Sequence, residues 1–263
     1  MHLDDALRHA HETGAPIVVP YVMVDRARLG GLERVVRTLR AGGATAIELG
    51  FPFSDPIADG PVLEHAAHRA LDHGTRWHDL LRACRTTSRL LPTAVMTYAN
   101  PVWQKRLDRG LGELVRAGAS GLIVPDLSFE ESRPFRLAAE TAGLALVLLA
   151  APGTSPNRTR ALARSSRGFL YLVSHYGTTG TSTQGRSFDL RSIVRTAHRA
   201  APRLPVLVGF GVRDRATAVR ALESGADGVV VGTALEELLA RNRSPHDVTR
   251  WLRTISTARA SSR

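Results

Sequence analysis

Hydrophobic residues gather in short runs along the chain, separated by longer segments that mix apolar and polar positions. The runs are rich in Val, Ile and Leu, and they are apolar throughout instead of alternating with polar residues. Such runs predict strands that are covered on both faces, as in a parallel sheet. The predicted strands are 16–24, 44–49, 93–98, 121–125, 144–151, 168–174, 205–208 and 227–231.

The segments between these runs have apolar residues at spacings of three and four, which predicts helices. They are 31–41, 61–89, 108–117, 131–142, 156–165, 188–200 and 214–224. Junctions such as Ala142-Gly143 and Gly225-Ala226 are typical of a helix that ends at a glycine and leads into the next strand. Eight such alternations in about 250 residues predict an α/β fold, a closed (β/α)8 or TIM barrel.

The two ends of the chain predict further helices. Residues 1–14 form an expected extra N-terminal amphipathic helix, and residues 245–257 the last helix. Residues 258–263 are expected to fray. Because no linker or low-complexity segment interrupts the pattern, residues 1–263 are predicted to form a single domain.

The composition agrees with a globular protein of the cytoplasm. Hydrophobic residues make up 43% of the 263 positions, which is enough for a large core. No apolar run approaches the ~18 residues that span a bilayer, so no membrane association is expected. The first five residues do not resemble a secretory signal, and Cys84 has no second cysteine to pair with.

The formal net charge of +11 raises the possibility of nucleic-acid binding. The basic residues are almost all arginines scattered along the predicted helices, and no nucleic-acid motif is present. Pairs such as Arg213/Arg215 and Arg241/Arg243 are therefore expected on solvated faces. We expect no nucleic-acid partner, and the excess charge favours a phosphorylated substrate.

Three carboxylates occupy the stretch from Ile47 to Pro61. Glu48 lies within an apolar strand, and Asp55 and Asp59 lie on the glycine- and proline-rich loop that follows. Glu48 could be a buried ion-pair partner, but its apolar neighbours would raise its pKa, which favours catalysis. Asp59 could cap the helix that begins at Pro61 or act in the site, and the second role is favoured. For Asp55 a turn or cap is favoured.

In a TIM barrel the chemistry takes place where strands end and loops begin. The residues predicted at these ends are Tyr21, Glu48, Tyr98, Asp126, Tyr171, Gly209-Phe210-Gly211 and Gly232-Thr233. Burial in the barrel wall is the alternative for each aromatic residue. Two of the glycine turns follow the last two strands, and a third, which contains Thr179 and Gly180, follows the sixth. Glycine turns and a helix N-terminus after strands seven and eight predict a phosphate site.

The whole stretch from Ile47 to Pro61 resembles the signature of the tryptophan synthase alpha subunit family. The resemblance continues through most of the chain, in Val19-Pro20-Tyr21, Tyr98-Ala99-Asn100, Pro125-Asp126-Leu127, Glu130-Glu131-Ser132, Tyr171-Leu172-Val173-Ser174, Thr179-Gly180, Gly209-Phe210-Gly211 and Gly232-Thr233. It implies a lyase that cleaves indole-3-glycerol phosphate to indole and glyceraldehyde 3-phosphate by a retro-aldol reaction.

Three chemical routes can serve a retro-aldol reaction. A Schiff base requires a strand lysine, but the only lysine is Lys105 on a loop. A metal requires converging ligands, and among the histidines only His175 is near a strand end. Acid–base chemistry by carboxylates remains, so no metal and no cofactor is expected in this chain.

The resemblance also implies roles for individual residues. Glu48 would protonate indole C3 and assist removal of the glycerol hydroxyl proton, and Asp59 would interact with the indole N–H. The residues that would shape the indole pocket are Tyr21, Tyr98, Asp126 and Phe210. Tyr171 would orient Glu48. A further implication is a partner, a PLP-dependent beta subunit that receives the indole.

Two segments depart from the family pattern. The chain reads Met23-Val24-Asp25-Arg26-Ala27 after the first strand, and His175 replaces the usual arginine after the sixth. These departures leave open a stand-alone indole-3-glycerol-phosphate lyase or a non-catalytic relative that activates a beta-type partner. An unrelated phosphate-sugar isomerase barrel would explain the glycine turns but not the 47–61 stretch.

Overall fold

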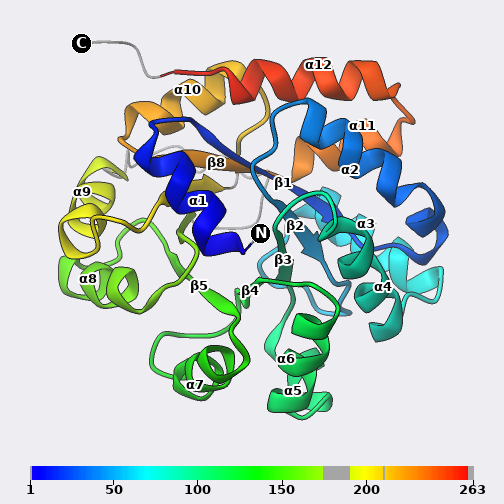
Figure 1. The fold of residues 1–263 in the computed structure, drawn as a ribbon, viewed down its shortest axis with the longest axis horizontal. Helices are drawn as coiled ribbons and strands as arrows, with labels where there is room; N and C mark the ends of the chain where they lie inside the picture. Colours follow the sequence, from blue (N-terminus) through cyan, green and yellow to red (C-terminus); the bar gives the residue numbers. More distant parts are fainter. Residues whose placement is uncertain (1, 174–189, 210, 260–263) are drawn as a thin grey trace.

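The computed structural model describes residues 2–173, 190–209 and 211–259, and these form a closed parallel barrel (Figure 1). Its strands follow the chain order, each paired with the next, and the last pairs with the first. The strands are β1 (Ile17–Met23), β2 (Ile47–Gly50), β3 (Thr93–Met96), β4 (Gly121–Ile123), β5 (Ala145–Ala150), β6 (Leu170–Val173), β7 (Val206–Gly209) and β8 (Gly228–Val231). The predicted TIM barrel is confirmed.

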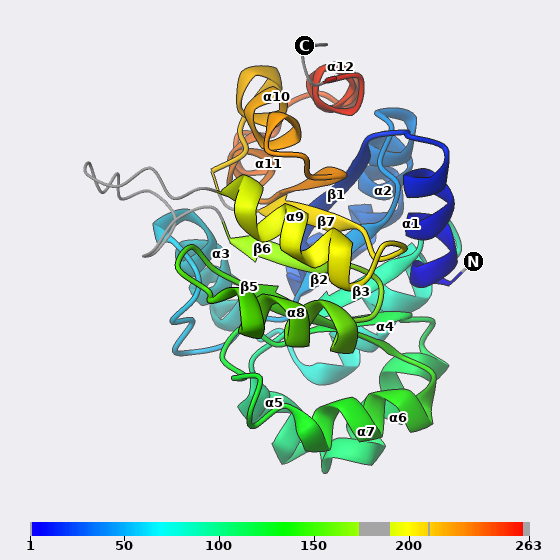
Figure 2. The ribbon, with the colours of Figure 1, turned by 90° about the vertical axis from the view of Figure 1, so that its left-hand side faces the viewer.

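The helices surround the barrel and connect successive strands (Figures 1 and 2). They are α1 (Leu3–Glu12), the 3-10 helix η1 (Arg26–Gly31), α2 (Leu32–Ala41), α3 (Pro61–Asp72), α4 (Trp77–Thr87), α5 (Ala99–Gln104), α6 (Leu107–Arg116), α7 (Arg133–Ala142), α8 (Pro156–Ser165), α9 (Leu190–Ala200), α10 (Arg215–Glu223), α11 (Thr233–Ala240) and α12 (Pro245–Ser256). No helix of the described segments is long and apolar enough to cross a bilayer.

Most predicted helices are confirmed, with shifts of a few residues at their ends. The segment 61–89 is two helices, α3 and α4, because the chain turns between them at Gly74, which has a φ of 73°. The short helices η1 and α5 were not predicted. The prediction that residues 258–263 fray is wrong for Ala258, because its side chain is fully buried in the core.

Each strand buries both of its faces, as its continuous apolar run predicts. On β1, Val18 and Val22 pack in the cluster between the barrel and its helices, whereas Val19 and Tyr21 belong to a second cluster inside the barrel. The alternation follows from the two-residue period of a strand. In register, Tyr21 pairs with Glu48 on β2, so a carboxylate enters this interior layer of apolar side chains.

The extra N-terminal helix α1 closes one end of the barrel (Figures 1 and 2). Leu3 and Leu7 are fully buried and belong to the cluster inside the barrel. The Asp4 carboxylate also accepts a hydrogen bond from the Gly168 N–H. With this end closed by α1, a ligand must enter from the opposite end, where the strands finish.

Candidate active site

Glu48 is buried inside the barrel without a polar partner among the described residues. Its side chain has no exposed surface, and neither carboxylate oxygen has a hydrogen bond there. Ile47 and Leu49, its neighbours on β2, point to the outer core and fix the inward direction of Glu48. Burial, and secondly the charge of Asp59, raises the pKa of Glu48 to about 8. The described structure therefore contradicts a buried ion pair for Glu48.

Asp59 lies on the loop between β2 and α3 and is 4% exposed. It does not cap α3, since the N-cap residue is Gly60 and no side-chain cap bond is present. Its Oδ1 atom is buried without a hydrogen bond in the described part of the chain. Burial, followed by the charge of Glu64, raises the pKa of Asp59 to about 7. Asp55 instead is exposed and accepts a hydrogen bond from the Ser54 hydroxyl at 2.5 Å, as expected for a turn residue.

The two carboxylates line one cavity of about 230 Å³ at the end of the barrel where the strands finish. Its lining consists of Tyr21, Glu48, Asp59, Pro61, Val62, Leu63, Met96, Tyr171, Gly211, Val212, Arg213, Val230, Gly232 and Thr233. Apolar walls with two buried acids suit a largely apolar ligand that exchanges a proton. Within the described ranges, no group of three or more His, Cys, Asp or Glu is placed to hold a metal ion.

Two buried tyrosines shape the cavity, and each depends on a neighbouring glycine. A Cβ atom on Gly50 would lie 1.9 Å from the Tyr21 hydroxyl, and one on Gly209 would lie 2.2 Å from that of Tyr171. Burial raises the pKa of both tyrosines well above 10.0, so both stay neutral. Gly209 thus serves the site by making room for Tyr171, and it does not itself line the cavity.

Two other predicted pocket residues do not line the cavity. The Tyr98 hydroxyl accepts the Ala58 N–H at 3.1 Å, and its ring stacks on Phe53 with centroids 5.1 Å apart. Asp126 is exposed and accepts the Ala99 N–H at 2.9 Å. Tyr98 therefore supports the loop that carries Asp59, and Asp126 supports the start of α5.

Only some of the residues predicted to bind the phosphate lie in the described structure. Gly211, Gly232 and Thr233 line the cavity, and α11 begins at Thr233, shortly after β8, where a helix N-terminus is predicted. Thr179, Gly180, Phe210 and His175 lie outside the described residues. Arg213 was expected only on a solvated face, but it also lines the cavity, and its position two residues after Gly211 was a usable signal.

A family model described as "Tryptophan synthase alpha chain" matches residues 7–259 of this chain. The chain belongs to the tryptophan synthase alpha chain family. Curated relatives include the tryptophan synthase alpha chain of Microcystis aeruginosa, 37% identical over 92% of both chains. That of a Synechococcus species is 40% identical over 86% of this chain and 84% of the relative.

Solved structures agree with this family assignment. A tryptophan synthase chain from Mycobacterium tuberculosis superposes with a TM-score of 0.86 at 31% identity, covering 99% of this chain and 98% of that one. The tryptophan synthase subunit alpha of Legionella pneumophila gives 0.82 at 28% identity over 98% of each chain. The resemblance drawn from the stretch Ile47 to Pro61 is thereby confirmed, and an unrelated isomerase barrel is ruled out.

Proposed function

We propose that this chain is a carbon–carbon lyase that cleaves indole-3-glycerol phosphate to indole and glyceraldehyde 3-phosphate, as the alpha subunit of a tryptophan synthase. The observation that supports it most is the pair Glu48 and Asp59. Both carboxylates are buried, both have oxygens without hydrogen bonds in the described structure, and both line one apolar cavity. Family membership agrees with the same reaction.

Glu48 is suited to deliver and then recover a proton. With a pKa of about 8 its carboxyl group is protonated at neutral pH, although it lies inside the barrel. It donates that proton to C3 of the indole ring, which weakens the bond from C3 to the glycerol chain. The resulting carboxylate accepts the proton of the adjacent glycerol hydroxyl as the C–C bond breaks, leaving the aldehyde and indole.

Asp59 stabilises the charge that develops in this step. Protonation at C3 makes the indole nitrogen cationic, and a carboxylate near the N–H lowers the energy of that state. Its pKa of about 7 leaves a substantial fraction ionised near neutral pH. Its negative charge in turn helps to keep the proton on Glu48 before the reaction.

The phosphate of the substrate binds at the N-terminus of α11. Gly211, Gly232 and Thr233 line that end of the cavity, and the backbone N–H groups and dipole of a helix N-terminus favour an anion. Arg213 adds a positive charge from the same lining, although its guanidinium also pairs with Glu237 at 2.7 Å. Tyr21 and Tyr171 form the walls around the indole ring.

The partner implied by the family is a PLP-dependent beta subunit. Ile57 on the loop before Asp59 is 73% exposed, and Trp103 on α5 is 50% exposed. Exposed apolar side chains at the open end of the barrel suit such a contact. A single buried cysteine, Cys84, suits the cytoplasm, where we place the reaction.

The departures at Met23–Ala27 and His175 keep a second candidate, a stand-alone indole-releasing lyase. The experiment measures indole release from indole-3-glycerol phosphate by the purified chain, alone and with a beta subunit. Slow release that rises sharply with the partner identifies the synthase subunit, and rapid release unchanged by the partner identifies the stand-alone lyase. No indole under either condition refutes both.

A further inference from the structure

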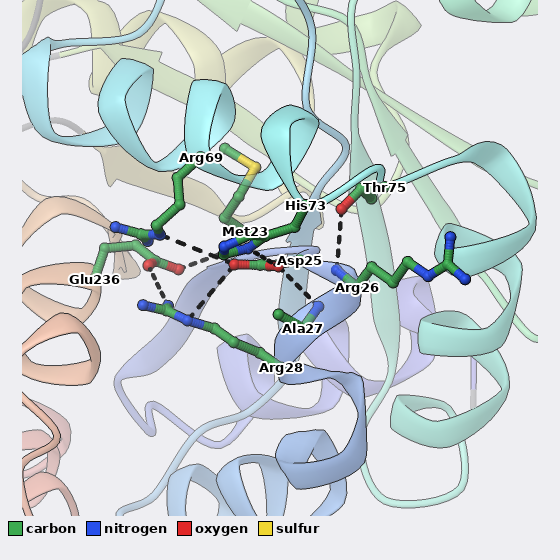
Figure 3. Close-up of polar contacts among 9 residues, drawn as sticks. All are labelled: Met23, Asp25, Arg26, Ala27, Arg28, Arg69, His73, Thr75 and Glu236. Atoms are coloured by element: carbon green, nitrogen blue, oxygen red, sulfur yellow. Dashed lines mark hydrogen bonds and ion pairs between the residues drawn. The ribbon is translucent and has the colours of Figure 1, made fainter.

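A cluster of charged side chains that includes two buried carboxylates surrounds the end of β1, outside the substrate cavity (Figure 3). Asp25 follows the strand, Arg28 comes from η1, Arg69 and His73 come from α3 and its end, and Glu236 comes from α11. Asp25 and Glu236 are 3% and 2% exposed. The cluster includes part of the segment 23–27 in which the chain departs from the family pattern.

Glu236 replaces a strand partner that the barrel does not supply. The register of β1 against β8 ends at Pro20 and Val231, and the chain then enters α11. Backbone N–H groups of a strand point alternately to its two neighbours. Ile17 donates to Asp227 on the β8 side, so Met23, six residues on, points its N–H to the same side, beyond the end of β8. The Glu236 carboxylate accepts that N–H at 2.8 Å.

The other carboxylate oxygen of Glu236 is held by Arg28. Arg28 Nη1 donates to Glu236 Oε2 at 3.2 Å, and its Nε lies 3.8 Å from Asp25 Oδ2. Asp25 in turn faces Arg69 Nε at 3.9 Å and His73 Nδ1 at 2.9 Å. Two carboxylates and two guanidinium groups balance, which allows both acids to stay buried. Such networks fix geometry more than they add stability.

The hydrogen bond between Glu236 and Met23 joins two elements, α11 and β1, that both contribute residues to the cavity lining. Glu236 lies in the first turn of α11, and its own N–H donates to the carbonyl of Gly232 at 3.0 Å. Gly232 and Thr233 line the cavity, and so does Tyr21, two residues before Met23. The side chain of Glu236 therefore ties the start of α11 to the strand that supplies the cavity wall.

We propose that Glu236, held by Arg28, is a positioning residue that sets the N-terminus of α11 for binding the phosphate group of the substrate. This inference rests on the proposed function, because it takes the start of α11 as the phosphate end. Small displacements of backbone donors are costly at such a site, since each N–H must meet an anion oxygen at hydrogen-bond distance.

The test compares Glu236→Ala, Glu236→Gln and a control, Asp227→Asn. Asp227 accepts the Val206 N–H at 2.7 Å, the same kind of strand contact, but it lies directly before β8, at the end of the barrel where the strands begin. Two affinities are measured by calorimetry, for glycerol 3-phosphate and for indole, together with kcat and KM for indole release. Glycerol 3-phosphate reports on the phosphate end without the indole ring.

Glu236→Ala is expected to weaken glycerol 3-phosphate binding and raise KM by about tenfold, with kcat and indole affinity changed by less than about twofold. Glu236→Gln keeps an oxygen for the Met23 N–H, so its affinity for glycerol 3-phosphate is expected to fall by only about threefold. Asp227→Asn is expected to lower stability and leave both affinities unchanged.

Equal affinity for glycerol 3-phosphate in the wild type and Glu236→Ala would overturn the role of Glu236. A parallel loss of both affinities in Glu236→Ala and in Asp227→Asn would also overturn it, because general destabilisation would then explain the result. Glycerol 3-phosphate binding without indole release would refute the proposed reaction, while selective loss in the variants would still support Glu236. A wild type that does not bind glycerol 3-phosphate would refute both.

Discussion

Two pairs of buried carboxylates lie near β1, and they differ in their partners. Glu48 and Asp59 face the cavity, and neither has an ion pair in the described structure. Asp25 and Glu236 are almost as buried, but Arg28 and Arg69 lie beside them (Figure 3). The comparison shows that burial alone does not distinguish a reactive acid from a structural one.

The presence or absence of a cationic partner makes the difference. Burial raises the pKa of Glu236 above 4.5, but the Met23 N–H and the charges of Arg28 and Arg69 oppose that rise. For Glu48 both causes, burial and Asp59, act in the same direction, and the pKa reaches about 8. An acid that keeps its proton at neutral pH can donate it, whereas a paired carboxylate fixes the backbone.

The largest expected effect comes from removing the transferable proton. Glu48→Gln should lower kcat for indole release by at least about 10³-fold, since the amide neither donates nor recovers the proton. Its fold and its affinity for glycerol 3-phosphate should stay close to wild type, as circular dichroism and calorimetry can check. Retention of most of the activity would show that Glu48 is a structural acid like Asp25.

A smaller loss is expected at the second cavity acid. Asp59→Asn removes the charge that stabilises the cationic ring nitrogen, so kcat should fall about 10²-fold while KM changes little. Steady-state kinetics separate the two parameters. A rise in KM with unchanged kcat would mean that Asp59 binds substrate and transition state equally.

The unpaired acids should also make stability depend on pH. The folded protein keeps the Glu48 proton up to about pH 8, whereas an unfolded chain loses it near 4.5, so the folded state binds more protons between these values. The free energy of unfolding should therefore fall as pH rises through this window, by up to about 1.4 kcal/mol per pH unit. Urea unfolding of wild type and Glu48→Gln at several pH values tests this, and parallel curves would contradict it.

The smallest effect is expected for a paired acid far from the cavity. Asp227 accepts a hydrogen bond from the Val206 N–H. Its carboxylate oxygens also lie 2.8 Å from His11 Nδ1 and 2.9 Å from His198 Nε2. Although burial alone would raise its pKa, His198 and the Val206 N–H hold it below 3.8. Asp227→Asn should lower the free energy of unfolding by about 1–3 kcal/mol without changing kcat. A kcat that falls with it would break the distinction between paired and unpaired acids.

The apolar runs were sufficient to predict the barrel, because a strand buried on both faces leaves a clear local pattern. Glu48 was predictable for the same reason, as a charge in such a run. The helices η1 and α5 were missed because six residues are too few to show a helical period.

The contacts between distant segments could not be predicted from the sequence. Glu236 meets Met23 only because β8 closes on β1 across 213 positions of the chain. Tyr98 and Asp126 lie two and three residues beyond the ends of β3 and β4, and their side chains bond to backbone N–H groups of neighbouring segments. No local pattern distinguishes a strand-end side chain that turns inward from one that turns to a loop.

The closure of the barrel by α1 imposes an order on biosynthesis. Leu3 fits against the space left by Gly121 and Gly168, where a Cβ atom would lie 2.5 and 3.0 Å from its Cδ2. The ribosome releases Leu3 early, but both of these glycines must follow before it can be buried. Until these glycines are in place, the nascent chain exposes the apolar face of α1, which a chaperone could bind.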